Sequence, residues 1–435
     1  MRPFFVTILF ISLFAQSADA QFITSPWFIT SEKDYRLSQP SSYKTEIEQV
    51  LTAQKNLDDA GRIQIAFWSA GAPGYRWYEM MDKLWTVDTG YYGALANMLL
   101  ATAIYDATLA AWDSKNTVKR PRPYAVDGRV KALAVKTESY SYPCEHAVAA
   151  GVAVTIISKF YPQLTDSVMR MAHKAINARI SAGMAFPTDT RDGFELGKRI
   201  ALLAIEKTKD YVNTARWDGK IPEGADKWRG TFAMLPMAGT NKPMVLSSGS
   251  QFRPAPPPNF EKEMAELKTY KQSFRSRANA FFWASQDFWS SYLNKKIFEH
   301  NYHLDPRVAA SISAIAAVGS YDGFISCWDA KYAYWGIRPE QYDTTFKPLM
   351  GAPPFPGYPS GHAAISGVNS ELLSYFFPED KAFFQQKAKD AAESRFQAGI
   401  HFRSDNEVAL VLGRKVAAAI IEKVQAKTTA YNSNR

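Results

Sequence analysis

The segment YDGFISCWDAK, residues 321–331, has an earlier counterpart, YDATLAAWDSK, at residues 105–115. The two copies lie 216 positions apart, and the same separation relates further residues in the same order without a gap. These pairs are Arg122-Pro123 and Arg338-Pro339, Tyr142-Pro143 and Tyr358-Pro359, His146 and His362, Arg179 and Arg395, Asp189 and Asp405, and Gly197 and Gly413. Another stretch, IAFWSAG at 65–71, resembles AFFWASQ at 280–286 one position out of step. The sequence therefore predicts an internal duplication.

Both copies have the apolar spacing of helices. Stretches such as 93–115 and 406–427 place apolar residues at i, i+3, i+4 and i+7, and long alternating strand patterns are absent. The segment between the copies is rich in Pro and Gly, with QFRPAPPP at 251–258. We therefore predict an all-α fold of two tandem helical bundles, related by the duplication and joined by a long irregular connection. The predicted units are a first bundle at 21–212, the connection at 213–278 and a second bundle at 279–435.

The amino-acid composition and the charge restrict the possible functions only weakly. The chain has 435 residues, 46% of them hydrophobic and 21% charged, and its formal net charge is +9. No block of Lys and Arg and no nucleic-acid motif accompanies that charge, so a field that attracts small anions is the simplest interpretation. Two cysteines, Cys144 and Cys327, could form one disulfide, but two free buried thiols are the favoured interpretation.

The N-terminus has the pattern of a secretory signal. Arg2 precedes the apolar run at 4–15, and QSADA follows with a cleavage site near Ala20. We therefore expect residues 1–20 to be removed and the mature protein to be periplasmic or secreted. We expect no later segment to be apolar for long enough to span a membrane.

Two groups of cationic residues stand near expected helix ends in the second copy. Lys331 and Arg338 are seven residues apart, so on one helix they would share a face, and Pro339 would end that helix. Arg395 lies near the end of another helix, which Gly399 should break. Each could instead be an ordinary solvated charge.

Two histidines stand at expected helix starts. The stretch GYPSGHAAISG at 357–367 places Ser360 where it could cap a helix, Gly361 where an anion could approach the backbone, and His362 beside them. The stretch SDNE at 404–407 is expected to form a capping box opened by Ser404 and closed by Glu407. His401 then falls in a tight connection, four residues before Asp405. Three cations, a helix N-terminus and two histidines could converge on one tetrahedral or bipyramidal oxyanion.

These spacings form one pattern, K-x6-R-P, then P-S-G-H, then S-R-x5-H-x3-D. The chain thereby resembles the superfamily of type 2 phosphatidic acid phosphatases, bacterial acid phosphatases and vanadium-dependent haloperoxidases, and within it the bacterial two-bundle haloperoxidase-like proteins. The resemblance implies that the oxyanion is held by Lys331, Arg338, Ser360, Gly361 and Arg395. It also implies that His401 is the phosphate nucleophile or the vanadate ligand, His362 the acid/base, and Asp405 the group that orients His401.

The first copy departs from this pattern. It keeps the cations, His146 and Asp189, but the nucleophile position is Ala185, and Cys144 and Glu145 replace the Ser and Gly of the anion seat. A carboxylate there would repel an anion, and no covalent step is possible without the histidine. We therefore expect a buried structural ion pair in the first copy and one working site per chain.

The choice of reaction stays open at this point. Trp328 and Phe355 match positions that line the vanadate pocket of haloperoxidases, although plain core packing explains them equally well. The short interval 363–393 between the second and third motifs is typical of phosphatases. We favour a vanadate-dependent haloperoxidase acting on peroxide and halide, with vanadate as cofactor. The alternative is an acid phosphatase that uses a phosphohistidine and no cofactor. An oxyanion-binding protein without turnover is disfavoured by His362 and His401, which pure binding does not need. The sequence does not determine the oligomeric state.

Overall fold

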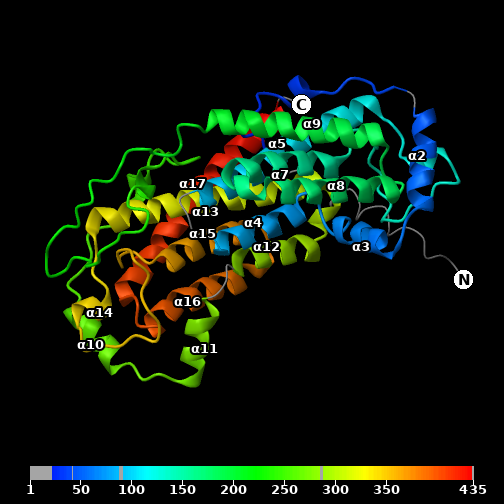
Figure 1. Cartoon of the computed structure of the whole chain (residues 1–435). Coiled ribbons are helices and arrows are strands. Elements are labelled where there is room, and N and C mark those ends of the chain that lie inside the picture. Colours follow the sequence, from blue (N-terminus) through cyan, green and yellow to red (C-terminus); the bar gives the residue numbers. More distant parts are fainter. Residues whose placement is uncertain (1–21, 42, 88–91, 285–287, 434–435) are drawn as a thin grey trace, which may run out of the picture.

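The computed structural model describes residues 22–433 except 42, 88–91 and 285–287 (Figure 1). The predicted signal segment 1–20 lies outside the described residues and stays a prediction. Within the described part of the chain the regular structure is helical, and the β-structure is a single isolated bridge between Lys227 and Gly336. The predicted all-α class is confirmed.

The two copies of the repeat form matching sets of helices. The first set comprises α5 (Gly93–Val118), α6 (Pro123–Val126), α7 (Glu145–Phe160), α8 (Thr165–Ser181) and α9 (Pro187–Lys207). The second set comprises α13 (Pro306–Tyr334), α14 (Pro339–Tyr342), α15 (Gly361–Phe376), α16 (Lys381–Gln397) and α17 (Arg403–Ser433). Helices α2 (Lys44–Lys55), α3 (Asp59–Trp68) and α4 (Tyr75–Val87) precede the first set, and α10 (Glu261–Thr269), α11 (Phe274–Phe282) and α12 (Phe288–Glu299) precede the second. Short 3-10 turns are η2 (Glu32–Tyr35), η3 (Pro162–Leu164), η4 (Ala238–Thr240), η5 (Gly249–Phe252), η6 (Tyr302–Leu304) and η7 (Pro378–Asp380).

Local geometry repeats at the sequence offset. Helices α5 and α13 both end before a residue in the left-handed region, Lys119 at φ 52° and Trp335 at φ 55°. Asp106 of α5 accepts hydrogen bonds from three consecutive backbone N–H groups at 27–29, and Asp322 of α13 accepts three from 244–246. Each half therefore ties the strap of chain before it to its central helix, as expected of a duplication.

The central helices α5 and α13 pack against one another in the core (Figure 1). Their spans Gly93–Val126 and Pro306–Tyr334 are long and apolar enough to cross a membrane, so the expectation that no such segment follows the N-terminus was wrong. Both are mostly buried inside the fold. A helix surrounded by other helices on all sides needs the same all-round apolar composition as a membrane span.

Close helix contacts bring the motif-bearing ends together. A Cβ on Gly413 of α17 would lie 2.2 Å from the Ala364 carbonyl oxygen of α15. A Cβ on Gly197 of α9 would lie 2.1 Å from the Val148 carbonyl oxygen of α7. These glycines let each helix pair approach backbone to backbone. In the second half this places the start of α17 beside the start of α15.

The predicted irregular connection 213–278 is helical at its end. Helices α10 and the first half of α11 fall inside it. Phe260, Met264 and Leu267 have helical spacing and pack with Phe402 and Ile337. This docking, together with the capping Ser273 of α11, orders a segment that its Pro/Gly-rich beginning made us class as irregular throughout.

Two expected helix ends were also wrong. Helix α13 ends at Tyr334, and Pro339 begins α14 instead of ending α13, since proline suits the first helical turn. Lys331 and Arg338 therefore do not share a helix face. Ser404 is not the cap of α17: that helix begins at Arg403, and the Ser404 hydroxyl donates to Glu263. The role expected of Glu407 falls to Asp405, which accepts the Phe402 N–H, because α17 begins at Arg403 and Asp405 is therefore its third residue.

Candidate active site

The N-terminus of α15 forms one wall of the site. Ser360 caps it by accepting the Ala363 N–H, and the Ser360 N–H donates 2.9 Å to the Asp405 carbonyl of α17. A Cβ on Gly361 would meet only the Trp328 ring, at 3.5 Å. The first-turn N–H groups of the helix therefore face a place where an anion can approach closely.

Lys331 is fully buried beneath the loop that leads into α15. Its ammonium donates to the carbonyl oxygens of Pro356, Gly357 and Pro359 at 2.8, 2.9 and 2.6 Å. These bonds use all three donors of a lysine. Lys331 thus shapes the loop while adding positive charge to the site.

Arg338 fixes the tautomer of His401. Arg338 Nη1 lies 2.9 Å from His401 Nε2, and His401 Nδ1 lies 2.9 Å from Asp405 Oδ2. An arginine can only donate, so Nε2 is the acceptor and the ring proton sits on Nδ1, where it is donated to Asp405. The Nε2 lone pair is therefore turned toward the cationic side of the site. This is the tautomer that a nucleophile or a ligand atom requires.

Arg395 is held by a helix that the motifs did not include. Its Nη2 donates 2.6 Å to the Ala280 carbonyl of α11, and its Nε donates 2.9 Å to Ser394 Oγ. The sequence signal for α11 is the stretch AFFWASQ, which resembles IAFWSAG in the first half. Helix α11 is therefore a wall of the site.

His362 differs from its neighbours in being exposed to solvent on one side. The protein packed around the ring lowers its pKa to about 3, and Arg395 adds to that effect, whereas a hydrogen bond to the Trp283 backbone opposes it. The ring is neutral at physiological pH. Water reaches it, so it can exchange protons with a molecule in the site.

Two aromatic rings cover the cationic cluster. The Trp328 and Phe355 ring centroids are 5.3 Å apart, and Lys331 Nζ lies 5.8 and 5.0 Å from them. Trp328 Nε1 is buried without a hydrogen-bond partner in the described part of the chain. Both predicted lining residues thus lie at the site, and one has an unused donor.

The electrostatics of the cluster suit an oxyanion. Burial lowers the pKa of His401 well below its usual range, and Arg338, Lys331 and Arg395 lower it further. Burial is also the main cause that lowers the pKa of Lys331 and raises that of Asp405. Buried cations outnumber the one buried carboxylate, so an anion with several oxygens would neutralise them. These residues therefore fit phosphate or vanadate.

The equivalent place in the first half holds its own carboxylate. Glu145 pairs with Lys115 Nζ at 2.8 Å and with Arg122 Nη2 at 3.1 Å, and all three are buried. The expected buried ion pair is present. Asp189, which has no histidine to orient because the position is Ala185, pairs with Arg120 at 2.5 Å. Cys144 and Cys327 are buried and free, as favoured from the sequence.

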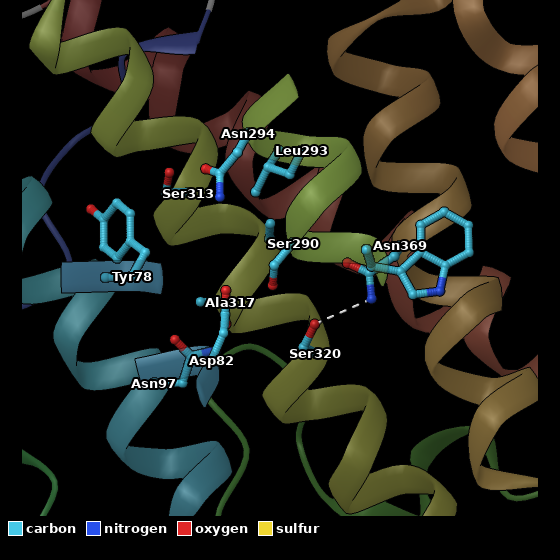
Figure 2. A pocket seen from close by; sticks show the side chains of 13 residues that line it. Tyr78, Asp82, Asn97, Ser290, Leu293, Asn294, Ser313, Ala317, Ser320 and Asn369 are labelled. Atoms are coloured by element: carbon cyan, nitrogen blue, oxygen red, sulfur yellow. Dashed lines mark hydrogen bonds between the residues drawn. The ribbon is translucent and has the colours of Figure 1, made fainter. Parts of the chain in front are cut away.

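A separate cavity of about 40 Å³ lies among α4, α5, α12, α13 and α15 (Figure 2). Its lining includes Asp82, Asn97, Asn294 and Asn369, and Asn369 donates to Ser320 Oγ at 3.3 Å. The lining contains none of the residues predicted for the site. A polar space of this size suits ordered water.

Comparison with protein families supports the resemblance seen in the motifs. Residues 91–211 match the PAP2 superfamily, and residues 382–429 match the second helical-bundle domain of VCPO. The second match contains Arg395, His401 and Asp405. No curated protein matches the chain. Both matched families are enzyme families, so the prediction that this chain is an enzyme is confirmed.

Solved structures share the fold. A bacterial vanadium-dependent iodoperoxidase is similar with a TM-score of 0.63 and 22% identity, over 81% of this chain and 96% of that chain. The holo form of a bacterial vanadium-dependent chloroperoxidase is similar with a TM-score of 0.59 and 12% identity, over 78% of this chain and 92% of that chain. The predicted resemblance and the helical-bundle fold are therefore confirmed, and neither comparison decides between peroxidase and phosphatase.

Proposed function

We propose that this enzyme is a vanadate-dependent haloperoxidase that oxidises a halide with hydrogen peroxide. The supporting observation is that the haloperoxidase-domain match covers Arg395 of α16, His401 in the connection after it and Asp405 of α17. The alignment with nearly the whole length of an iodoperoxidase agrees with this proposal.

The chain's own groups prepare the site for vanadate. His401 Nε2 carries no proton, because Nδ1 donates to Asp405, and its lone pair accepts from Arg338 until a ligand takes that place. Arg338, Lys331 and Arg395 supply positive charge, and the start of α15 supplies backbone N–H groups. Bound vanadate supplies Lewis-acid activation of peroxide toward a halide. His362, neutral and reached by water, accepts a proton from incoming peroxide and returns it to the departing oxygen.

The alternative is a phosphomonoesterase, which the short interval 363–393 favours. His401 Nε2 would then attack phosphorus, His362 in its protonated form would donate its proton to the leaving alcohol oxygen, and water would hydrolyse the phosphohistidine. The same cations would stabilise the five-coordinate transition state. The residues around the oxyanion serve both reactions.

Two assays on one purified sample distinguish the haloperoxidase from the phosphatase. We would measure iodide and bromide oxidation by peroxide, and p-nitrophenyl phosphate hydrolysis, each with and without orthovanadate. We expect vanadate to switch on halide oxidation, iodide being the easiest to oxidise, and phosphate to suppress it by competition. Robust phosphatase activity that vanadate only inhibits, with no halide oxidised, would falsify the proposal and establish the alternative.

A further inference from the structure

Helix α11 has an outer face that does not resemble an ordinary surface helix. Its Phe274 is 93% exposed and Phe281 is 53% exposed. The segment that contains it, YKQSFRSRANAFFWA at 270–284, has no acidic residue. In Figure 1 the helix lies at the edge of the molecule, with α16 on its inner side.

The helical repeat separates two faces. At about 100° per residue, Phe274, Ala278 and Phe281 fall within about 60° of one another on the outer side. Ser276, Ala280 and Trp283 are buried on the opposite side. The inner face carries the Ala280 carbonyl that holds Arg395, so the helix has a structural task inward and an apolar stripe outward.

Cations border this stripe. Arg275 and Arg277 are both exposed and flank Phe274 and Phe281, one on each side of the helix. Lys271 is exposed just before the helix begins. In the part of the chain that the structure describes, no acidic side chain forms an ion pair with these three residues. An aromatic stripe between free cations is the arrangement of helices that lie in a lipid interface.

We propose that the outer face of α11 docks on an anionic lipid surface. Phenylalanine rings enter the boundary between headgroups and acyl chains, while the flanking cations stay at the level of the lipid phosphates. The net charge of +9 attracts the whole protein to such a surface. A second copy of this chain fits less well, because two such faces would oppose their cations. Docking is independent of the reaction at His401, and binding is therefore measured without turnover.

The test is sedimentation of the full chain with phosphatidylcholine vesicles, with or without an equal share of phosphatidylglycerol. We expect binding to the mixed vesicles that falls with salt, and little binding to phosphatidylcholine alone. The pair Phe274→Ser and Phe281→Ser should weaken binding at least about tenfold. Phe232→Ser, at another exposed phenylalanine, is the matched control and should bind as the wild type.

A second pair tests the charges. Arg275→Gln with Arg277→Gln should remove the preference for phosphatidylglycerol, whereas Arg216→Gln, at an exposed arginine elsewhere, should not. All variants change exposed side chains, and circular dichroism confirms that they fold. Absence of binding to mixed vesicles, or equal binding by the phenylalanine pair, overturns the proposal. Light scattering that shows a dimer lost in the phenylalanine pair, without vesicle binding, assigns the face to a second copy and overturns it too.

Discussion

The two halves of this molecule build the same scaffold and fill it differently. Lys115 lies against backbone carbonyls of its loop as Lys331 does, and Arg122 donates to the Met184 carbonyl as Arg338 does to that of Ile400. In the first half a carboxylate of the chain, Glu145, neutralises these cations. In the second half Gly361 stands at that position, so no carboxylate from the start of α15 neutralises these cations, and their positive charge is left for a ligand. Glu145 at the helix start and Ala185 at the nucleophile position thus separate the structural ion pair of the first half from the site of the second.

The largest expected effect is the loss of turnover when His401, at the nucleophile position, is replaced. His401→Ala should lower turnover on the order of 10⁴-fold, because it removes the imidazole nitrogen assigned as nucleophile or vanadate ligand. His146→Ala in the first half, the counterpart of His362, should leave turnover per folded molecule within about twofold. Steady-state assays on both variants, with folding checked by thermal melts, measure this contrast. A folded His401→Ala enzyme with normal turnover would disprove the assignment.

Gly361→Glu should give the second half the carboxylate that neutralises the cations of the first half. The position has room, because a Cβ there meets only the Trp328 ring at ordinary contact distance. The new carboxylate would pair with Lys331 and Arg338 and exclude phosphate or vanadate, weakening binding on the order of 100-fold. Titration calorimetry with orthophosphate measures this. Gly351→Glu, which changes a glycine with open space around it, is the control and should bind normally.

Glu145→Gln tests the first half through stability. Removing this charge leaves Lys115 and Arg122 buried without their counter-ion, which should lower the free energy of unfolding by about 3–5 kcal/mol. Glu48→Gln removes an exposed partner of Arg129 and should cost less than about 1 kcal/mol. Urea denaturation measures both. Equal midpoints for the two variants would show that the first-half ion pair is not a stabilising element.

The smallest expected effect is a pH dependence of oxyanion affinity. Burial, followed by repulsion from Arg338, lowers the pKa of Lys331. Affinity is full while this ammonium is charged and is lost as pH rises through its pKa, so the decline begins below the ordinary lysine value of about 10.4. Lys331→Arg should keep its charge and flatten the decline. Calorimetry over a pH series checks this, and a constant wild-type affinity up to the ordinary lysine range would contradict it.

Much of the site could be predicted because its chemistry depends on side-chain type. The cations, the capping serine, the glycine and the two histidines can each be identified from the sequence by residue type. The constant offset between the two copies located their positions. The same offset identified Glu145 and Ala185 as departures. The helical class followed from apolar spacing, since a helix that buries one face must repeat its apolar residues.

Contacts made to backbone groups could not be predicted from residue types. Every residue type carries a carbonyl, so nothing in the sequence marks those that bind Lys331 or the Ala280 carbonyl that holds Arg395. Helix ends depended on neighbours as well: the Ser404 hydroxyl donates to Glu263 of α10, and Asp405 accepts the Phe402 N–H at the start of α17.

The sequence by itself determined the helical class, the repeat and the residue types that gather around an oxyanion. Only the tertiary structure decided that α11 forms a wall of the site and that His401 carries its proton on Nδ1. The reason is physical: side-chain chemistry is local and is encoded residue by residue. The partner of a backbone carbonyl, and the nitrogen that an arginine faces, depend on how distant helices pack.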